Sequence, residues 1–140
     1  MILGNITKED VSKFNLLVLS PGISVNAPIA QMFRDQEKPV WSEIELAYQA
    51  SKGRIAAITG TNGKTTTTAL TGEIMKGYYE SSFVVGNIGI PYTSVALDTK
   101  EDSVTTAEIS SFQLERSLIL NRMYVQFLIS HQIIWIVMVQ

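Results

Sequence analysis

Short apolar runs alternate along the chain with amphipathic or glycine-rich stretches, and this alternation predicts the secondary structure. Apolar runs bounded by turn residues predict buried strands at 16–19, 40–41, 55–59, 83–85 and 103–109. Helices are predicted between or after them, at 27–36, 43–50, 64–76 and 92–97. Ser42 is the expected N-cap of the second helix, whereas residues 1–13 form a mixed polar lead-in. Strands that alternate with helices imply right-handed crossovers and a parallel sheet, so the expected fold class is α/β.

The strand at 55–59 is followed by the glycine loop Gly60–Gly63, and then by Lys64 and a helix rich in Thr. A strand, a glycine loop, Lys-Thr and a helix form the layout of a P-loop. Backbone N–H groups in such a loop can point at phosphates without a Cβ in the way, and the helix N-terminus adds positive potential. The standard pattern has a glycine where this chain has Ile58. The alternative is therefore an ordinary strand-to-helix turn with a solvated lysine.

Two further polar segments follow predicted strands, Gly86–Gly89 after the strand at 83–85 and Glu108–Gln113 at the end of the strand at 103–109. Since the carboxyl ends of parallel strands meet at one edge of a sheet, we expect both segments to gather beside the glycine loop. Glu108 is a hard oxygen ligand placed where a Mg²⁺ ion beside the phosphates would need one. Taken alone, Glu108 fits a solvated carboxylate at a strand end better than a metal ligand. Simple turn or helix-cap roles remain open for Gly22, Asn87, Ser110, Ser111 and Gln113.

The amino-acid composition excludes several classes of function. The chain has 140 residues, of which 46% are hydrophobic, and a formal charge of −2, so it can bury a real core and lacks the basic excess of a nucleic-acid binder. The absence of cysteine removes disulfides, thiolate catalysis and cysteine metal sites. The single histidine, His131, has no metal-ligand spacing around it. No signal peptide is read at the N-terminus, and we expect a cytoplasmic protein.

Five segments taken together resemble the ATP-dependent muramyl ligases of peptidoglycan synthesis. They are Ser20-Pro-Gly-Ile23, Glu43-Ile-Glu-Leu46, Gly60-Thr-Asn-Gly-Lys-Thr65, Gly86-Asn-Ile-Gly89 and Glu108-Ile-Ser-Ser-Phe-Gln-Leu-Glu115. The resemblance covers roughly residues 4–115. The glycine loop is shared across the ligase superfamily, folate polyglutamate ligases included, whereas the first and last segments resemble the members that add D-glutamate.

The resemblance implies roles for individual residues. The phosphates of ATP would be bound by Gly60, Thr61, Asn62, Gly63, Lys64, Thr65 and Thr66. Lys64 would contact the transferred phosphate, and Thr65 and Glu108 would hold Mg²⁺, which makes Lys64 and Glu108 the expected catalytic residues. Contacts to the muramyl substrate, its diphosphate, its sugar and its reacting carboxylate would come from Asn87, Gly22, Ser110 and Gln113.

The resemblance also implies a reaction. The carboxylate of UDP-N-acetylmuramoyl-L-alanine would attack the γ-phosphate of ATP to give an acyl phosphate, and the amine of D-glutamate would then displace phosphate. Lys64 and Mg²⁺ would neutralise charge as an anion attacks a polyanion. We expect the parent enzyme to be a monomer without nucleic-acid or membrane partners. The open alternative is a stand-alone P-loop nucleotide-binding or regulatory module, although such a module usually ends an apolar strand with Asp.

Members of the family have three domains, and the resemblance implies that this chain holds parts of two. Residues 1–41 would be the end of the UDP-binding domain, and residues 42–116 would be the first part of the ATP-binding central domain. The domain that binds the amino acid would be absent. We therefore expect this polypeptide to be catalytically inactive alone, to bind nucleotide weakly, and to be poorly soluble because apolar sheet edges are uncovered.

Residues 117–140 depart from the family, which continues here with Asn-Ile-Thr-Pro-Asp-His-Leu-Asp-Arg-His. Codons read one base out of register can encode that motif, and shifted codons at 123–124, 135–136 and 138–139 are forced to Val, Asp and Gly. We therefore expect a one-nucleotide shift near Arg116, with loss of a histidine that in the family helps hold a second Mg²⁺. A transmembrane anchor is a competing interpretation, but the unbroken apolar run 133–139 is too short to cross a bilayer. The third interpretation of residues 117–140 is a genuine edge strand or helix.

Overall fold

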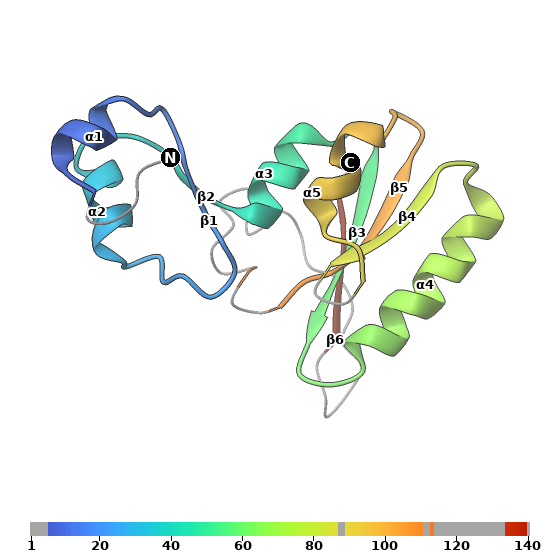
Figure 1. The fold of residues 1–140 in the computed structure, drawn as a ribbon. Helices are drawn as coiled ribbons and strands as arrows, with labels where there is room; N and C mark the ends of the chain where they lie inside the picture. The colour runs from blue at the N-terminus through green and yellow to red at the C-terminus, as the bar shows by residue number, and fades with distance from the viewer. Residues whose placement is uncertain (1–5, 87–88, 111–112, 114–133, 140) are drawn as a thin grey trace.

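A computed structural model of the chain describes residues 6–86, 89–110, 113 and 134–139. Two sheets organise the described part (Figure 1). The smaller sheet pairs β1 (Leu17–Leu19) with β2 (Val40–Ser42). The larger sheet has the spatial order β4 (Ser82–Gly86), β5 (Val104–Glu108), β3 (Arg54–Gly60) and β6 (Ile134–Val139). Helices accompany both sheets, which confirms the predicted α/β class.

The N-terminal part contains one helix that the sequence did not predict. The strands β1 and β2 are parallel, and α2 (Pro28–Arg34) lies between them in sequence, as expected. The additional helix α1 (Lys8–Ser12) lies within the mixed polar lead-in, for which the sequence predicted no particular element. A capping box starts it, because Asp10 N–H donates to Thr7 Oγ1 at 3.2 Å and Thr7 N–H donates to Asp10 Oδ2 at 3.2 Å.

Three strands of the larger sheet are parallel, as predicted from the alternation of strands and helices. Ala57 of β3 and Val85 of β4 both lie opposite Ala107 of β5. Strand β6 is antiparallel to β3 and pairs Ile136 with Ile58. Since β3 has neighbours on both edges, its residues 55–59 are only 0–5% exposed.

The two faces of the larger sheet carry different helices. On one face, α3 (Glu43–Ala50), α5 (Tyr92–Val95) and the 3₁₀ helix η1 (Ala96–Asp98) contribute to a core made of Ile44, Ala47, Ile55, Ala57, Val85, Tyr92, Ala96, Ala107 and Ile109. On the other face lies α4 (Lys64–Tyr78), whose Gly72 is so close to β4 that an added Cβ would stand 2.3 Å from Val84 Cγ2. Val84 and Val85 alternate across the strand, which places the helical layers on opposite faces.

Strand β6 falls within residues 117–140, the segment that we expect to depart from the family. A strand at Ile134–Val139 fits the interpretation of this region as an edge strand. Residues 117–133 lie outside the described residues. Among the helices that can be described, none is long and apolar enough to cross a membrane. The expected divisions after residues 41 and 116 stay predictions.

Candidate nucleotide-binding site

The carboxyl ends of β3, β5 and β4 meet at one edge of the larger sheet. In the register of these strands, Ile58, Glu108 and Gly86 form one row. The glycine loop begins just beyond Ile58, so the loop, Glu108 and the start of the Gly86–Gly89 segment gather as predicted. Asn87, which the resemblance assigned to the muramyl substrate, lies outside the described residues.

Two glycines shape the loop between β3 and α4. Gly60 has a φ of 143° and Gly63 a φ of 77°, in the range that disfavours residues with a Cβ. Gly63 is the N-cap of α4, and its carbonyl accepts a hydrogen bond from Thr67 N–H at 2.9 Å. No side-chain cap occupies this N-terminus among the described residues. The first N–H groups of a 15-residue helix therefore point into the loop, where an anion would be stabilised.

The Lys64 ammonium is folded back over the glycine loop. Its Nζ donates to the carbonyl oxygen of Gly60 at 2.9 Å and to that of Thr61 at 3.3 Å. A phosphate oxygen would be a stronger acceptor than either neutral carbonyl, because a hydrogen bond between two charged groups is shorter and stronger. The loop and first helical turn also expose the side chains of Thr61, Asn62, Thr65 and Thr66. The structure thus brings together all seven residues expected around the phosphates.

Glu108 is a buried carboxylate beside this loop. It is 3% exposed, and its carboxylate has no hydrogen bond or ion pair with any described residue. Thr106 and Glu108 alternate with Ala107, so the Glu108 side chain leaves the sheet on the face that carries α4. A buried charge is costly without a neutralising partner.

These residues fit a Mg²⁺ ion. Mg²⁺ binds hard oxygen ligands and usually takes one or two carboxylates together with substrate phosphates and waters. Glu108 supplies the carboxylate, and Thr65, in the first turn of α4, supplies an exposed hydroxyl on the same side of the sheet. Within the described ranges, no cluster of three or more His, Cys, Asp or Glu is placed to hold a metal ion alone.

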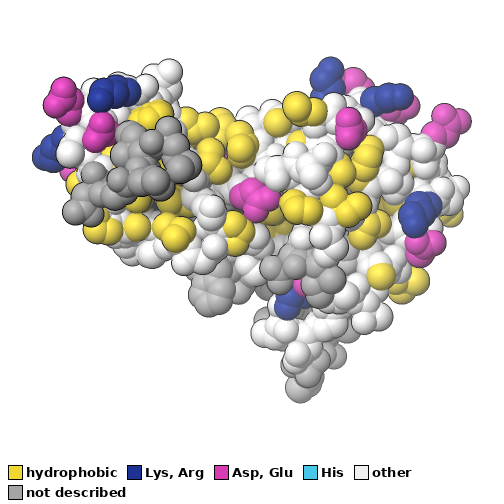
Figure 2. All heavy atoms as spheres, in the orientation of Figure 1, with side chains coloured by type: hydrophobic (Ala, Val, Ile, Leu, Met, Phe, Trp, Pro, Cys, Tyr) yellow, Lys and Arg dark blue, Asp and Glu magenta, His cyan; other side chains and the backbone are white. Residues whose placement is uncertain are grey.

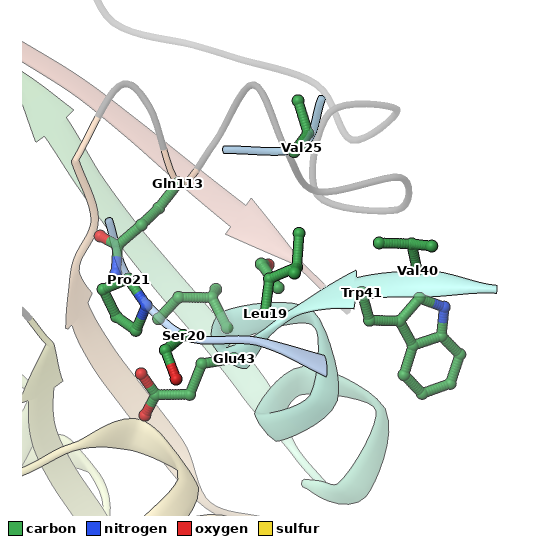
Figure 3. A pocket seen from close by; sticks show the side chains of 10 residues that line it. Leu19, Ser20, Pro21, Val25, Val40, Trp41, Glu43 and Gln113 are labelled. Carbon is green, nitrogen blue, oxygen red and sulfur yellow. The ribbon is translucent and has the colours of Figure 1, made fainter. Parts of the chain in front are cut away.

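Ser110 and Gln113 bond to each other just after β5. Ser110 N–H donates to Gln113 Oε1 at 2.9 Å, and Gln113 N–H donates to Ser110 Oγ at 3.2 Å. This reciprocal pair has the form of a capping box, so the helix-cap interpretation describes both residues well. Gln113 also lines a pocket with residues of the N-terminal part, which a cap alone does not require (Figure 3).

The pocket lies where the N-terminal strands approach the end of β5. It is lined by Leu19, Ser20, Pro21, Val25, Val40, Trp41, Ser42, Glu43, Ile44 and Gln113. Its volume of about 20 Å³ leaves room for about one water molecule. A nucleotide sugar is far larger, so this pocket alone does not enclose one. Gly22 is exposed in the segment after β1, with a φ of 93°, and does not line the pocket.

Two residues at this edge were missed by sequence reasoning. Glu43 lies in the Glu43-Ile-Glu-Leu46 segment, for which no functional role was predicted. It lines the pocket and accepts a hydrogen bond from Thr93 Oγ1 at 2.9 Å. Gly86 packs directly on the backbone of Glu108. The available signals were an acid directly after the N-cap Ser42 and a glycine at the last position of a strand.

The fold and this edge define an α/β unit of the P-loop type, with a strand, a glycine loop and a lysine at the start of a helix. The family described as Mur ligase middle domain matches residues 58–130. The chain therefore belongs to the Mur ligase family, and the resemblance drawn from its sequence motifs is confirmed.

Similar curated proteins carry the name UDP-N-acetylmuramoylalanine–D-glutamate ligase. The chain is 58% identical to that of Lachnospira eligens over 115 residues, which are 82% of this chain and 26% of the relative. It is 56% identical to that of Lachnoclostridium phytofermentans over 115 residues, 82% of this chain and 25% of the relative. It is 52% identical to that of Alkaliphilus metalliredigens over 116 residues, 81% of this chain and 26% of the relative. The chain thus spans about a quarter of the length of these relatives.

Proposed function

We propose that this chain is the ATP-binding part of a cytoplasmic, monomeric ligase that adds D-glutamate to UDP-N-acetylmuramoyl-L-alanine in peptidoglycan synthesis. Relatives named for that reaction support the assignment. The observation that carries it is the juxtaposition, at neighbouring strand ends, of a glycine loop with Lys64 and the buried carboxylate of Glu108. This pairing offers donors to a polyanion and a ligand to the cation that accompanies it.

In this proposal ATP is held mainly by backbone groups. The N–H groups of the loop and of the first turn of α4 bind the phosphates, and Lys64 exchanges the Gly60 carbonyl for an oxygen of the transferred phosphate. Thr65 and Glu108 would hold Mg²⁺, and that ion would supply positive charge to neutralise the phosphates. Because Glu108 is buried, its attraction for the cation is weakly screened by water.

The proposed reaction activates a carboxylate. A carboxylate oxygen of UDP-N-acetylmuramoyl-L-alanine bonds to the γ-phosphorus of ATP while the bond to the bridging oxygen breaks, giving an acyl phosphate and ADP. The amine of D-glutamate then bonds to the acyl carbon, phosphate leaves with its oxygen, and the nitrogen loses a proton. Lys64 stabilises the charge that builds up on the phosphoryl oxygens. Ser110, Gln113, Gly22 and Asn87 are assigned to the muramyl substrate.

The polypeptide alone is proposed to be inactive as a ligase. The chain spans about a quarter of the length of its relatives. The proposal assigns D-glutamate binding to the rest of the parent protein. ATP binding is expected to persist, because residues 60–66 and Glu108 lie on one continuous sheet edge.

A chimera tests the proposal. Residues 4–115 of this chain replace the matching segment of the Lachnospira eligens relative, to which the chain is 58% identical. The chimera should make the amide product, detected by mass spectrometry, only when ATP, UDP-N-acetylmuramoyl-L-alanine and D-glutamate are all present. Lys64→Met should lower this rate by about 100-fold or more, since it removes a cation that stabilises the transition state.

Lys76→Met in the same chimera is the matched control. Lys76 is exposed on α4 and pairs only with Glu73, at 2.6 Å, among the described residues, so its loss should leave ligation nearly unchanged. A folded chimera that hydrolyses ATP without forming the amide would reject the D-glutamate ligase and favour a P-loop nucleotide-binding module.

A further inference from the structure

Gly86 is pressed against the backbone of the proposed metal ligand. It is the last residue of β4, lies opposite Glu108 in the sheet and has a φ of 128°. A Cβ added at Gly86 would stand 2.2 Å from the carbonyl oxygen of Glu108 and 2.6 Å from its amide nitrogen. Real Cβ atoms essentially never approach other atoms closer than 3.0 Å, so any other residue at this position must displace one of the two strands.

The atoms that Gly86 contacts have little room to yield. They belong to the backbone of Glu108 at the end of β5, and β5 is buried along its whole length between β4 and β3. The Gly86 N–H also donates to the carbonyl oxygen of Ile90 at 3.1 Å, which ties the turn after β4 to the same point. A side chain at Gly86 would therefore move the Glu108 backbone, the turn, or both.

We infer that Gly86 is a positioning residue for the Glu108 carboxylate. Because Gly86 has no side chain, β4 can pack closely against the Glu108 backbone and keep the carboxylate where it can bind a cation that also contacts phosphates in the glycine loop. This inference rests on the proposed function. Metal ligands need placement to within about half an ångström, and the groups that support them matter nearly as much as the ligands themselves. Gly86 has no polar side chain, so it acts on the ion only through Glu108.

The test compares ATP binding by the 140-residue chain with Mg²⁺ and with EDTA, using calorimetry. The measured quantity is the gain in ATP affinity that Mg²⁺ provides. Gly86→Ala should reduce this gain by about 10-fold, while ATP binding in EDTA changes little because the phosphate loop is untouched.

Gly53→Ala is a matched control. Gly53 also has a positive φ, 78°, and a Cβ there would stand 2.3 Å from the Ser103 carbonyl oxygen, next to the opposite end of β5. It should cost stability much as Gly86→Ala does and keep the full Mg²⁺-dependent gain. If the two variants lose the gain equally, Gly86 is only structural and the inference is wrong.

A double-mutant cycle separates the inference from the proposed function. Glu108→Gln should abolish the Mg²⁺-dependent gain, and adding Gly86→Ala to it should change nothing further. A wild-type chain that binds ATP equally with and without Mg²⁺ would overturn the proposed function along with the inference. A normal gain in the wild-type chain that Gly86→Ala also retains would overturn the inference alone.

A second measurement, by NMR, uses only the wild-type chain, so it does not depend on whether Gly86→Ala folds. Adding Mg²⁺ to the ATP-saturated wild-type chain should shift the amide resonances of Glu108 and Gly86 and leave that of Gly53 in place. Unmoved Gly86 and Glu108 resonances would contradict the inference.

Discussion

At the scale of single residues, the candidate site holds two opposite charges that do not neutralise each other. The Lys64 ammonium donates to carbonyl oxygens of its own loop, and Glu108 is buried without an ion pair among the described residues. Both groups lack the partner that would suit them best. A nucleotide with its cation would supply an anion to Lys64 and a cation to Glu108, so the proposed site should bind ATP more tightly when Mg²⁺ is present.

A buried tyrosine gives a prediction about pH. Tyr92 is 2% exposed, and burial raises its pKa above the ordinary value of 10.0, although the 2.6 Å hydrogen bond with Ser51 opposes the shift. A raised pKa in the folded state means that stability is fully present below about pH 10 and is lost as the pH rises through the folded-state value. Tyr92→Phe should lower the free energy of unfolding by about 1 kcal/mol at pH 8 and flatten this alkaline loss.

Urea unfolding between pH 8 and 11 measures both effects. Tyr78→Phe is the control, because Tyr78 is 83% exposed and its hydroxyl meets no described partner. The same alkaline slope in Tyr92→Phe and in the wild-type chain would rule out Tyr92 as its origin.

At the scale of elements, the packing of α4 against the sheet depends on one glycine, Gly72. A Cβ at Gly72 would stand 2.3 Å from Val84 Cγ2, whereas a Cβ at Gly77 in the same helix would meet nothing within 4 Å. Gly72→Ala should therefore lower the free energy of unfolding by about 1–3 kcal/mol through overpacking. Gly77→Ala should raise it by about 0.5–1 kcal/mol, because alanine loses less conformational entropy in a helix.

Urea denaturation of the two variants checks this pair. Equal changes of the same sign in the free energy of unfolding would mean that the packing of α4 against the sheet does not depend on Gly72.

The pattern of apolar residues was sufficient to predict the alternating strands and helices. It was insufficient to predict features that depend on contacts between distant segments. Apolar runs predicted β3, β4 and β5, and the Lys-Thr start predicted α4 at its first residue. The helix α1 was missed because it is one short turn with an aspartate, not a glutamate, closing its capping box. The contact of Gly86 with Glu108 and the pocket at Gln113 depend on strand register and on segments far apart in sequence, which periodicity does not encode.

At the scale of the whole molecule, much apolar surface stays uncovered. Leu70, Tyr78 and Leu97 are 62%, 83% and 86% exposed. Figure 2 shows hydrophobic side chains over one face of both the N-terminal part and the larger sheet. The two-stranded sheet is also smaller than parallel sheets that are stable alone. These features fit a chain that spans about a quarter of its relatives, and the expected poor solubility stays a prediction.

The origin of residues 117–140 is a prediction at the same scale. If a one-nucleotide shift near Arg116 produced them, the coding DNA read one base out of register should continue as Asn-Ile-Thr-Pro-Asp-His-Leu-Asp-Arg-His. Sequencing the DNA across this region and downstream checks it. Third bases that do not spell this motif would show that the frameshift hypothesis is wrong.

We propose that the edge formed by the glycine loop and Glu108 binds ATP with Mg²⁺. The most direct test of this proposal is a calorimetric titration of the 140-residue chain with ATP in Mg²⁺, repeated with Lys64→Met and with Lys76→Met. We expect the wild-type chain and Lys76→Met to bind ATP. Lys64→Met should lose about 10- to 100-fold in affinity, because it removes one charge-assisted hydrogen bond. A folded wild-type chain that does not bind ATP, or a Lys64→Met chain that binds it equally well, would contradict the proposal.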